Sequence, residues 1–142
     1  MLVKLPTSYR VALYIQEDKH GEEQADSLLS QLKTLMIKVK RWGTIAEIYV
    51  DTSSPSAFNR DRPGLSMLLA DVHRGKFDAI LVTEIWRLFR NAEVGYELSE
   101  LITSAGKYLI SLDGLVDTMN ENSTLLDHYK WVHFQRLMDK SK

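Results

Sequence analysis

The sequence lacks cysteine, a large net charge and any long apolar run, and each absence excludes a class of protein. With no cysteine among its 142 residues, the chain forms no disulfide and no thiolate metal site, which is typical of a reducing compartment. The formal charge of −1 does not indicate a nucleic-acid binder, so strong DNA binding would need a local basic patch or a partner. No apolar run is long enough to span a bilayer. We therefore expect a cytoplasmic protein with no membrane contact.

Several motifs that bind cofactors are also missing. There is no G-x-G-x-x-G or G-x-x-x-x-G-K-[ST] loop, so the backbone turn that cradles phosphate in nucleotide-binding proteins is absent. The four histidines show no zinc-binding spacing, and no G-x-S-x-G turn marks a hydrolase nucleophile. We expect no cofactor and no bound metal.

The chain does contain four short apolar runs that alternate with helical patterns. The runs are continuously apolar, which predicts strands covered on both faces, and the helical patterns repeat every 3.6 residues. In chain order the predicted elements occupy residues 10–15, 22–42, 44–50, 63–74, 77–83, 92–105, 108–112 and 123–140. This order predicts βαβ units in an α/β sandwich of three layers, with helices on both faces of a mostly parallel sheet of four to five strands.

The last predicted helix, 123–140, has a broad apolar surface and follows no strand that needs a crossover. Its apolar side chains either pack onto the sheet or form an interface with a partner. The candidate interface residues are Leu126, Tyr129, Val132, Phe134 and Leu137.

Charged residues collect where the predicted strands end, at the edge where open parallel sheets bind ligands. The acids are Glu17, Asp18, Asp51, Glu84 and Asp113, and the nearby arginines are Arg60, Arg62, Arg87 and Arg90. Arginine forks suit phosphate, which favours a phosphodiester site. Carboxylates suit Mg²⁺, which favours an acidic pocket of receiver or phosphatase type built on Glu17, Asp18 and Glu84. A third interpretation is a set of solvated rim charges.

Six stretches, in the right order, resemble the catalytic domain of the serine site-specific recombinases, the resolvase and invertase family. They are SLLSQL (27–32), YVD (49–51), DRPGL (61–65), LLADV with GKFD (68–72 and 75–78), IWRLFRN (85–91), and LISLD with VDT (109–113 and 116–118). The resemblance implies a resolvase-like α/β domain over residues 1–122. Residues 123–142 would then begin the family's dimerisation helix, with no DNA-binding domain present.

The same resemblance implies a chemistry that this sequence does not reproduce. In the family, a serine in a Y-x-R-V-S motif at the end of the first strand attacks a DNA phosphate, and arginines clamp that phosphate. Aligned on Tyr14, the sequence places Gln16 at the arginine position and Asp18 at the serine position. A carboxylate is repelled by a phosphodiester, and its acyl phosphate would be prone to hydrolysis. We therefore expect a domain that cannot cleave DNA.

The remaining arginines predict the remnant of a phosphate site. They are Arg60, Arg62, Arg87 and Arg90. We expect the domain to act in recombination by association or regulation, as a homodimer or with an active recombinase, and to contact DNA weakly or indirectly. An alternative is an active enzyme with a displaced nucleophile, for which Ser53, Ser54 and Ser56 are the candidates.

Overall fold

The computed structural model describes residues 9–17, 24–41, 43–52, 62–89 and 92–140, and its centre is a parallel sheet. The strands are β1 (Tyr9–Gln16), β2 (Gly43–Asp51), β3 (Ala79–Val82) and β4 (Tyr108–Ser111). They form one four-stranded sheet in the order β2-β1-β3-β4, and each neighbouring pair is parallel. The continuous apolar runs therefore predicted the strands, and their alternation with helical patterns predicted the parallel direction, correctly.

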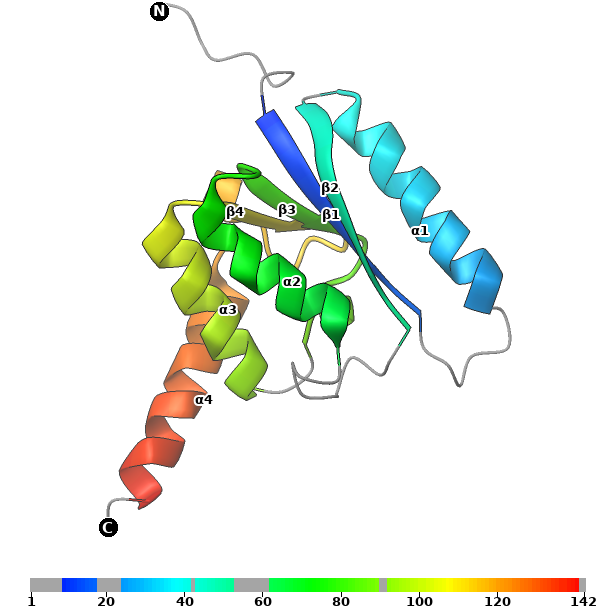
Figure 1. Ribbon diagram of the computed structural model, residues 1–142. Helices are drawn as coiled ribbons and strands as arrows, with labels where there is room; N and C mark the ends of the chain where they lie inside the picture. The colour runs from blue at the N-terminus through cyan, green and yellow to red at the C-terminus, as the bar shows by residue number, and fades with distance from the viewer. Residues whose placement is uncertain (1–8, 18–23, 42, 53–61, 90–91, 141–142) are drawn as a thin grey trace, which may run out of the picture.

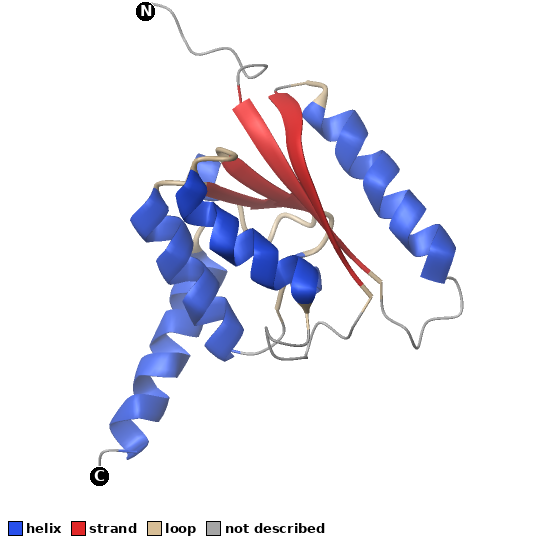
Figure 2. Cartoon of the chain, viewed as in Figure 1, coloured by secondary structure: helices blue, strands red, loops and turns tan. Residues whose placement is uncertain are grey.

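Helices cover both faces of this sheet, so the predicted three-layer α/β arrangement is confirmed (Figure 1). Helix α1 (Gln24–Val39) lies on one side, and α2 (Pro63–Asp71) and α3 (Ala92–Ala105) lie on the other (Figure 2). Short 3₁₀ turns follow at η3 (Val72–Arg74), η4 (Ile85–Arg87) and η5 (Thr118–Asn120). The predicted helix at 63–74 is thus α2 with a tighter last turn. None of the helices in the described part of the chain is both long and apolar enough to cross a membrane.

The side chains of β1 divide between two cores because successive residues of a strand point to opposite faces. Leu13 and Ile15 pack with Leu35 of α1. Tyr14 points the other way and packs with Leu65 of α2. Burial on both faces explains why this strand shows no alternation of apolar and polar residues.

Helix α4 (Thr124–Lys140) is anchored to α3 by its first half. The Tyr129 ring meets the Phe89 ring edge-on with centroids 5.2 Å apart, and a Cβ added at Gly95 would lie only 3.0 Å from the Tyr129 ring. Tyr96 and His133 stack with centroids 4.1 Å apart. The glycine therefore allows the close approach on which this helix contact depends.

A buried carboxylate joins β2 to the end of α2. Asp71 is 2% exposed, accepts a 2.7 Å hydrogen bond from the Tyr49 hydroxyl, and lies 3.0 Å from the Arg74 guanidinium and 3.7 Å from the Lys76 amine. Burial alone would raise the pKa of Asp71, but the tyrosine hydrogen bond and the two cations outweigh it and hold that pKa below its ordinary value. Burial and the neighbouring carboxylate raise the pKa of Tyr49.

The lowered pKa of Asp71 predicts that the free energy of unfolding depends on pH. Because the folded-state pKa of Asp71 lies below the unfolded one, its contribution is present above the unfolded pKa and is lost as the pH falls through the folded pKa. We expect Asp71→Asn to lower the free energy of unfolding at pH 7 by about 1–3 kcal/mol. Urea denaturation from pH 7 down to pH 3 should show the gap between variant and parent narrowing below about pH 4. If the difference in free energy of unfolding between variant and parent is constant over this range, Asp71 does not contribute to stability as an ionised carboxylate.

Candidate functional site

The candidate site lies where β1 and β3 end. The chain leaves β1 towards β2 on one side and β3 towards β4 on the other, so the crevice between these two strand ends is a topological switch point. Gln16 is the last residue of β1 and is fully buried. The carboxyl edge therefore presents a neutral amide at the position where the resemblance implies an arginine.

The backbone of Gln16 is held by two side chains from other elements. The Gln31 side chain of α1 accepts a 3.1 Å hydrogen bond from the Gln16 amide nitrogen and donates a 2.8 Å bond to its carbonyl oxygen. Arg87 donates a further 2.9 Å bond to the same carbonyl. One residue later, the Glu17 amide donates to the Asp51 carbonyl at 2.8 Å. The strand end is thus fixed up to the position that precedes Asp18.

A buried polar chain runs along the other face of the sheet. Arg62 is 0% exposed and donates a 2.8 Å hydrogen bond to the Tyr14 hydroxyl, which in turn donates a 2.6 Å bond to Asp51. The two guanidinium Nη atoms of Arg62 also donate to the carbonyls of Leu88 and Arg87, both at 2.6 Å. Burial is the main reason that the pKa of Tyr14 is raised, so this hydroxyl stays protonated. The cation is therefore enclosed by protein acceptors.

Asp51 anchors the start of α2 to the end of β2. Its two carboxylate oxygens accept the backbone N–H groups of Gly64 and Leu65 at 2.7 and 2.8 Å. A carboxylate at a helix N-terminus pairs with unsatisfied N–H groups and with the positive end of the helix dipole. Asp51, one of the acids predicted at the strand ends, is therefore a structural cap.

Arg87 is the second described arginine of the predicted phosphate site. Its guanidinium lies over the Trp86 ring, 4.0 Å from the centroid, and 3.3 Å from the Glu84 carboxylate. The side chain is 11% exposed. Arg87 is thus more exposed than Arg62, but its guanidinium is already engaged by the Glu84 carboxylate and the Trp86 ring.

A hollow of about 380 Å³ opens beside Arg87 at this edge. It is lined by Ser30, Gln31, Thr34, Thr83, Glu84, Arg87, Leu112 and Asp113. Three buried side-chain atoms here have no hydrogen-bond partner among the described residues: Thr83 Oγ1, Glu84 Oε2 and Arg87 Nε. The lining therefore includes several polar side chains, and its cation and carboxylate, Arg87 and Glu84, already form an ion pair with each other.

The structure brings part of the predicted site together. Gln16, Arg87 and Glu84 meet at the strand ends, whereas Arg62 lies inside the fold. The predictions on Asp18, Arg60, Arg90, Ser53, Ser54 and Ser56 concern positions outside the described residues. Among the described residues, no group of three or more histidines or carboxylates is placed to hold a metal ion.

The predicted interface residues of α4 fall into two groups. Leu126 is 3% exposed in the core, and Tyr129 packs on Phe89, so both contact the chain's own α3 side. Val132 is half-buried. Phe134 and Leu137 are 61% and 51% exposed, and Trp131 and Met138 beside them are also exposed. The second half of α4 therefore presents an apolar surface to solvent.

The sequence interpretation missed the roles of Tyr14, Gln31 and Asp51. Gln31 lies on the buried face of α1, between Leu28 and Leu35, and a polar side chain within an apolar stripe was a signal for an internal hydrogen bond. Tyr14 carried no comparable signal because a tyrosine in a buried strand commonly serves only as core.

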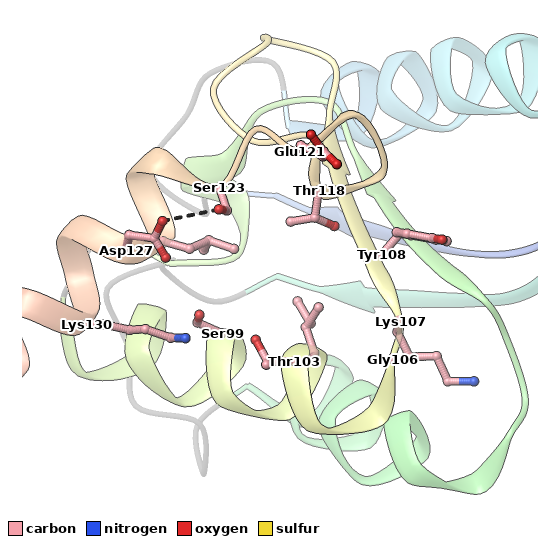
Figure 3. Close-up of a pocket in the computed structure, with 12 residues that line it drawn as sticks. Ser99, Thr103, Gly106, Lys107, Tyr108, Thr118, Glu121, Ser123, Asp127 and Lys130 are labelled. Atoms are coloured by element: carbon pink, nitrogen blue, oxygen red, sulfur yellow. Dashed lines mark hydrogen bonds between the residues drawn. The ribbon is translucent and has the colours of Figure 1, made fainter.

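A second hollow, of about 410 Å³, lies away from these strand ends, where β4 begins. Figure 3 shows Ser99 and Thr103 of α3 on one side, and Ser123, Asp127 and Lys130 at the start of α4 on the other. Ser123 donates a 3.2 Å hydrogen bond to Asp127. This hollow belongs to the junction of α3 and α4 and has no residue in common with the carboxyl edge.

Comparison of the sequence with known families identifies the family to which this fold and site belong. Residues 18–132 match the family described as "Resolvase, N terminal domain". The chain belongs to this family. The match begins at residue 18, so the last residues of β1, Gln16 included, precede the matched part of this resolvase domain. No curated protein sequence matches the chain.

Solved structures share the fold of this resolvase domain. The N-terminal catalytic domain of TP901-1 integrase superposes with a TM-score of 0.74 at 22% identity, over 91% of this chain and 98% of that one. A resolvase family site-specific recombinase from Streptococcus pneumoniae gives 0.68 at 18% identity, over 94% and 93%. The C-terminal catalytic domain of ISC1926 TnpA, an IS607-like serine recombinase, gives 0.64 at 23% identity, over 72% and 67%. At these identities the likeness shows the fold.

Proposed function

We propose that this resolvase domain acts in DNA recombination by association or regulation and does not itself cleave DNA. The observation that carries the proposal is the end of β1, where Gln16 replaces the arginine and Asp18 the serine that the resemblance implies. Without a hydroxyl at that position, the covalent link to a DNA phosphate has no nucleophile. Loss of one transition-state clamp alone can cost about 10²-fold in rate or more.

The arrangement of the described arginines supports this proposal. Arg62 is fully buried and donates to two carbonyls and to Tyr14, so its guanidinium is not open to a phosphate in this arrangement. Arg87 is held by the Gln16 carbonyl and by Glu84. Both cations are therefore engaged by groups within the fold. We expect DNA binding to be weak or indirect.

A cleavage assay on supercoiled plasmid tests the proposal directly. We expect no nick and no protein attached to a 5′ end, because a carboxylate at position 18 is repelled by the phosphodiester. The reaction is resolved on a denaturing gel with and without protease, and a serine recombinase known to cleave its own site serves as the positive control. A nick that carries protein at its 5′ end would overturn the proposal.

The same assay distinguishes the alternative of a displaced nucleophile. If covalent DNA linkage occurs, Ser53→Ala, Ser54→Ala and Ser56→Ala are compared one at a time. Loss of the linkage in one variant alone would identify an active recombinase whose serine lies between β2 and α2 in the sequence.

We further propose that the domain associates with a second copy through the second half of α4. The exposed apolar residues Trp131, Phe134, Leu137 and Met138 support this, because soluble monomers seldom expose a large apolar patch without a partner. The helix projects beyond the sheet (Figure 1), so two copies can approach there without a clash between their α/β layers.

Sedimentation at tens of micromolar protein should therefore show a dimer. We expect Phe134→Glu to weaken dimerisation about tenfold or more, because the substitution places a charge inside an apolar contact. Leu115→Glu is the matched control, since Leu115 is similarly exposed in a loop away from α4. A monomeric parent protein, or an equal effect of both substitutions, would contradict this interface.

A further inference from the structure

The sheet has an uneven covering of helices. Four strands about 4.8 Å apart span a width that takes two helices about 10 Å in diameter on each face. One face carries α2 and α3, whereas in the described part of the chain α1 is the only helix on the other face (Figure 2). Helix α1 lies over β1 and contacts β2 and β3 beside it, so the outer edge of β2 carries no helix of its own on this side.

The uncovered edge of the sheet on this side is β2. In the register of β1 with β2, Ile48 pairs with Leu13 and Val50 with Ile15, so both point to the α1 face of the sheet. They are 46% and 44% exposed, although Leu13 and Ile15 beside them are buried. The residue that breaks the apolar run, Glu47, pairs with Ala12 and points to the opposite face. An apolar strip of β2 thus faces solvent where a helix would normally lie.

One flank of α1 continues this apolar strip. Ser30 and Thr34 line the hollow beyond β3, so they mark the flank of α1 that faces away from β2. At 100° per residue, Leu29 and Met36 lie on the opposite flank, next to β2, and both are exposed. Together Leu29, Met36, Ile48 and Val50 form an L-shaped apolar surface, which we call the α1–β2 step. Its floor is the strand and its wall is the helix.

Cations border the wall of the step. Lys33 and Lys40 project from the same flank of α1, one helical step outside Leu29 and Met36, and the backbone bond from Lys40 to the Met36 carbonyl continues the helical path. Within the described residues, no ion pair engages either lysine. The step therefore combines an apolar floor with an uncompensated basic rim.

We propose that the α1–β2 step binds an acidic amphipathic α-helix of a partner protein, which completes the helical layer over β2. The narrow floor of one edge strand beside α1 suits a single helix, and the apolar floor and wall suit an apolar stripe with residues spaced three and four apart. The lysines specify acidic residues along the edge of that stripe. This association uses a surface separate from the strand ends and from the second half of α4.

The probe is a synthetic, fluorescein-labelled helical peptide of about 14 residues, a length that spans the exposed part of β2 at 1.5 Å per residue. It carries leucines on one face and glutamates beside them, and a matched peptide replaces each glutamate with lysine. We expect fluorescence anisotropy of the full chain to show binding of the acidic peptide at least about tenfold tighter than the basic one. Added salt should weaken the acidic complex.

Substitutions then place the peptide on the step. Ile48→Glu should weaken binding of the acidic peptide about tenfold or more, and the pair Lys33→Glu with Lys40→Glu should invert the preference between the two peptides. Met67→Glu is the matched control, because Met67 is 54% exposed on α2, across the sheet. Circular dichroism and urea denaturation verify that each variant folds.

Three results would overturn the proposal. The first is equal binding, or no binding, of the two peptides by the parent chain. The second is an Ile48→Glu effect no larger than that of Met67→Glu. The third is a concentration-dependent oligomer that Ile48→Glu dissociates and Phe134→Glu does not, because the step would then join copies of this chain. None of these results depends on whether the domain cleaves DNA.

Discussion

Arg62→Met should lower the free energy of unfolding by about 3–5 kcal/mol, a large part of the roughly 5–15 kcal/mol that stabilises a domain of this size. The guanidinium is 0% exposed and donates to the carbonyls of Leu88 and Arg87 and to the Tyr14 hydroxyl. Methionine fills much of the volume but leaves both carbonyls without that donor. It also removes the cation that offsets buried Asp51 at the far end of the Tyr14 hydrogen bond.

Urea denaturation monitored by tryptophan fluorescence measures this effect, with the slope compared to confirm a two-state transition. Arg41→Met is the matched control: Arg41 is exposed, and the same chemical change should alter stability by less than about 0.5 kcal/mol. Arg62→Lys should fall between them, because an amine keeps the charge but cannot reach all three acceptors as a planar fork does. An Arg62→Met variant as stable as the Arg41→Met variant would show that this arginine is not a structural residue.

The fold followed from local patterns that its tertiary contacts reinforce. The strands at 10–15 and 44–50 were predicted to within a residue because both are predominantly apolar, although only β1 is buried on both faces and β2 leaves Ile48 and Val50 partly exposed. The helix at 63–74 was predicted as one element, but its last turn is a 3₁₀ turn that ends at Gly75. Periodicity alone does not distinguish these two geometries over a single turn.

The site was less predictable, because it depends on which charged groups the fold encloses. Arg62 and Arg87 are both arginines after a loop or strand end, and nothing local to them shows that one is fully buried and the other lies at the edge. Asp51 looked like a rim charge because the amides that it caps, at Gly64 and Leu65, lie more than ten residues further along the chain. Long-range pairing of this kind leaves no trace in spacing or composition.

The contact between Asp51 and the start of α2 depends on a glycine. A Cβ at Gly64 would lie 2.5 Å from the Val50 carbonyl oxygen and 3.0 Å from the Asp51 carboxylate carbon. The first contact is closer than packed atoms allow and the second is very tight, and the nearest atom belongs to the backbone, which cannot rotate away. Gly64→Ala must therefore push the first turn of α2 off the end of β2, and the two hydrogen bonds that Asp51 accepts there lengthen or break.

We expect Gly64→Ala to cost about 3 kcal/mol or more, the sum of overpacking and of two weakened bonds to a charged acceptor. Hydrogen exchange should be faster at the amides of residues 64 and 65 than in the parent protein, which locates the damage. Gly75→Ala is the matched control, because Gly75 has a φ of +68° with nothing within 4 Å of an added Cβ, so only backbone strain of about 1 kcal/mol applies. If both substitutions cost the same and the two amides stay protected, the close packing of α2 against β2 is not what holds Arg62 and Asp51 in their enclosed positions.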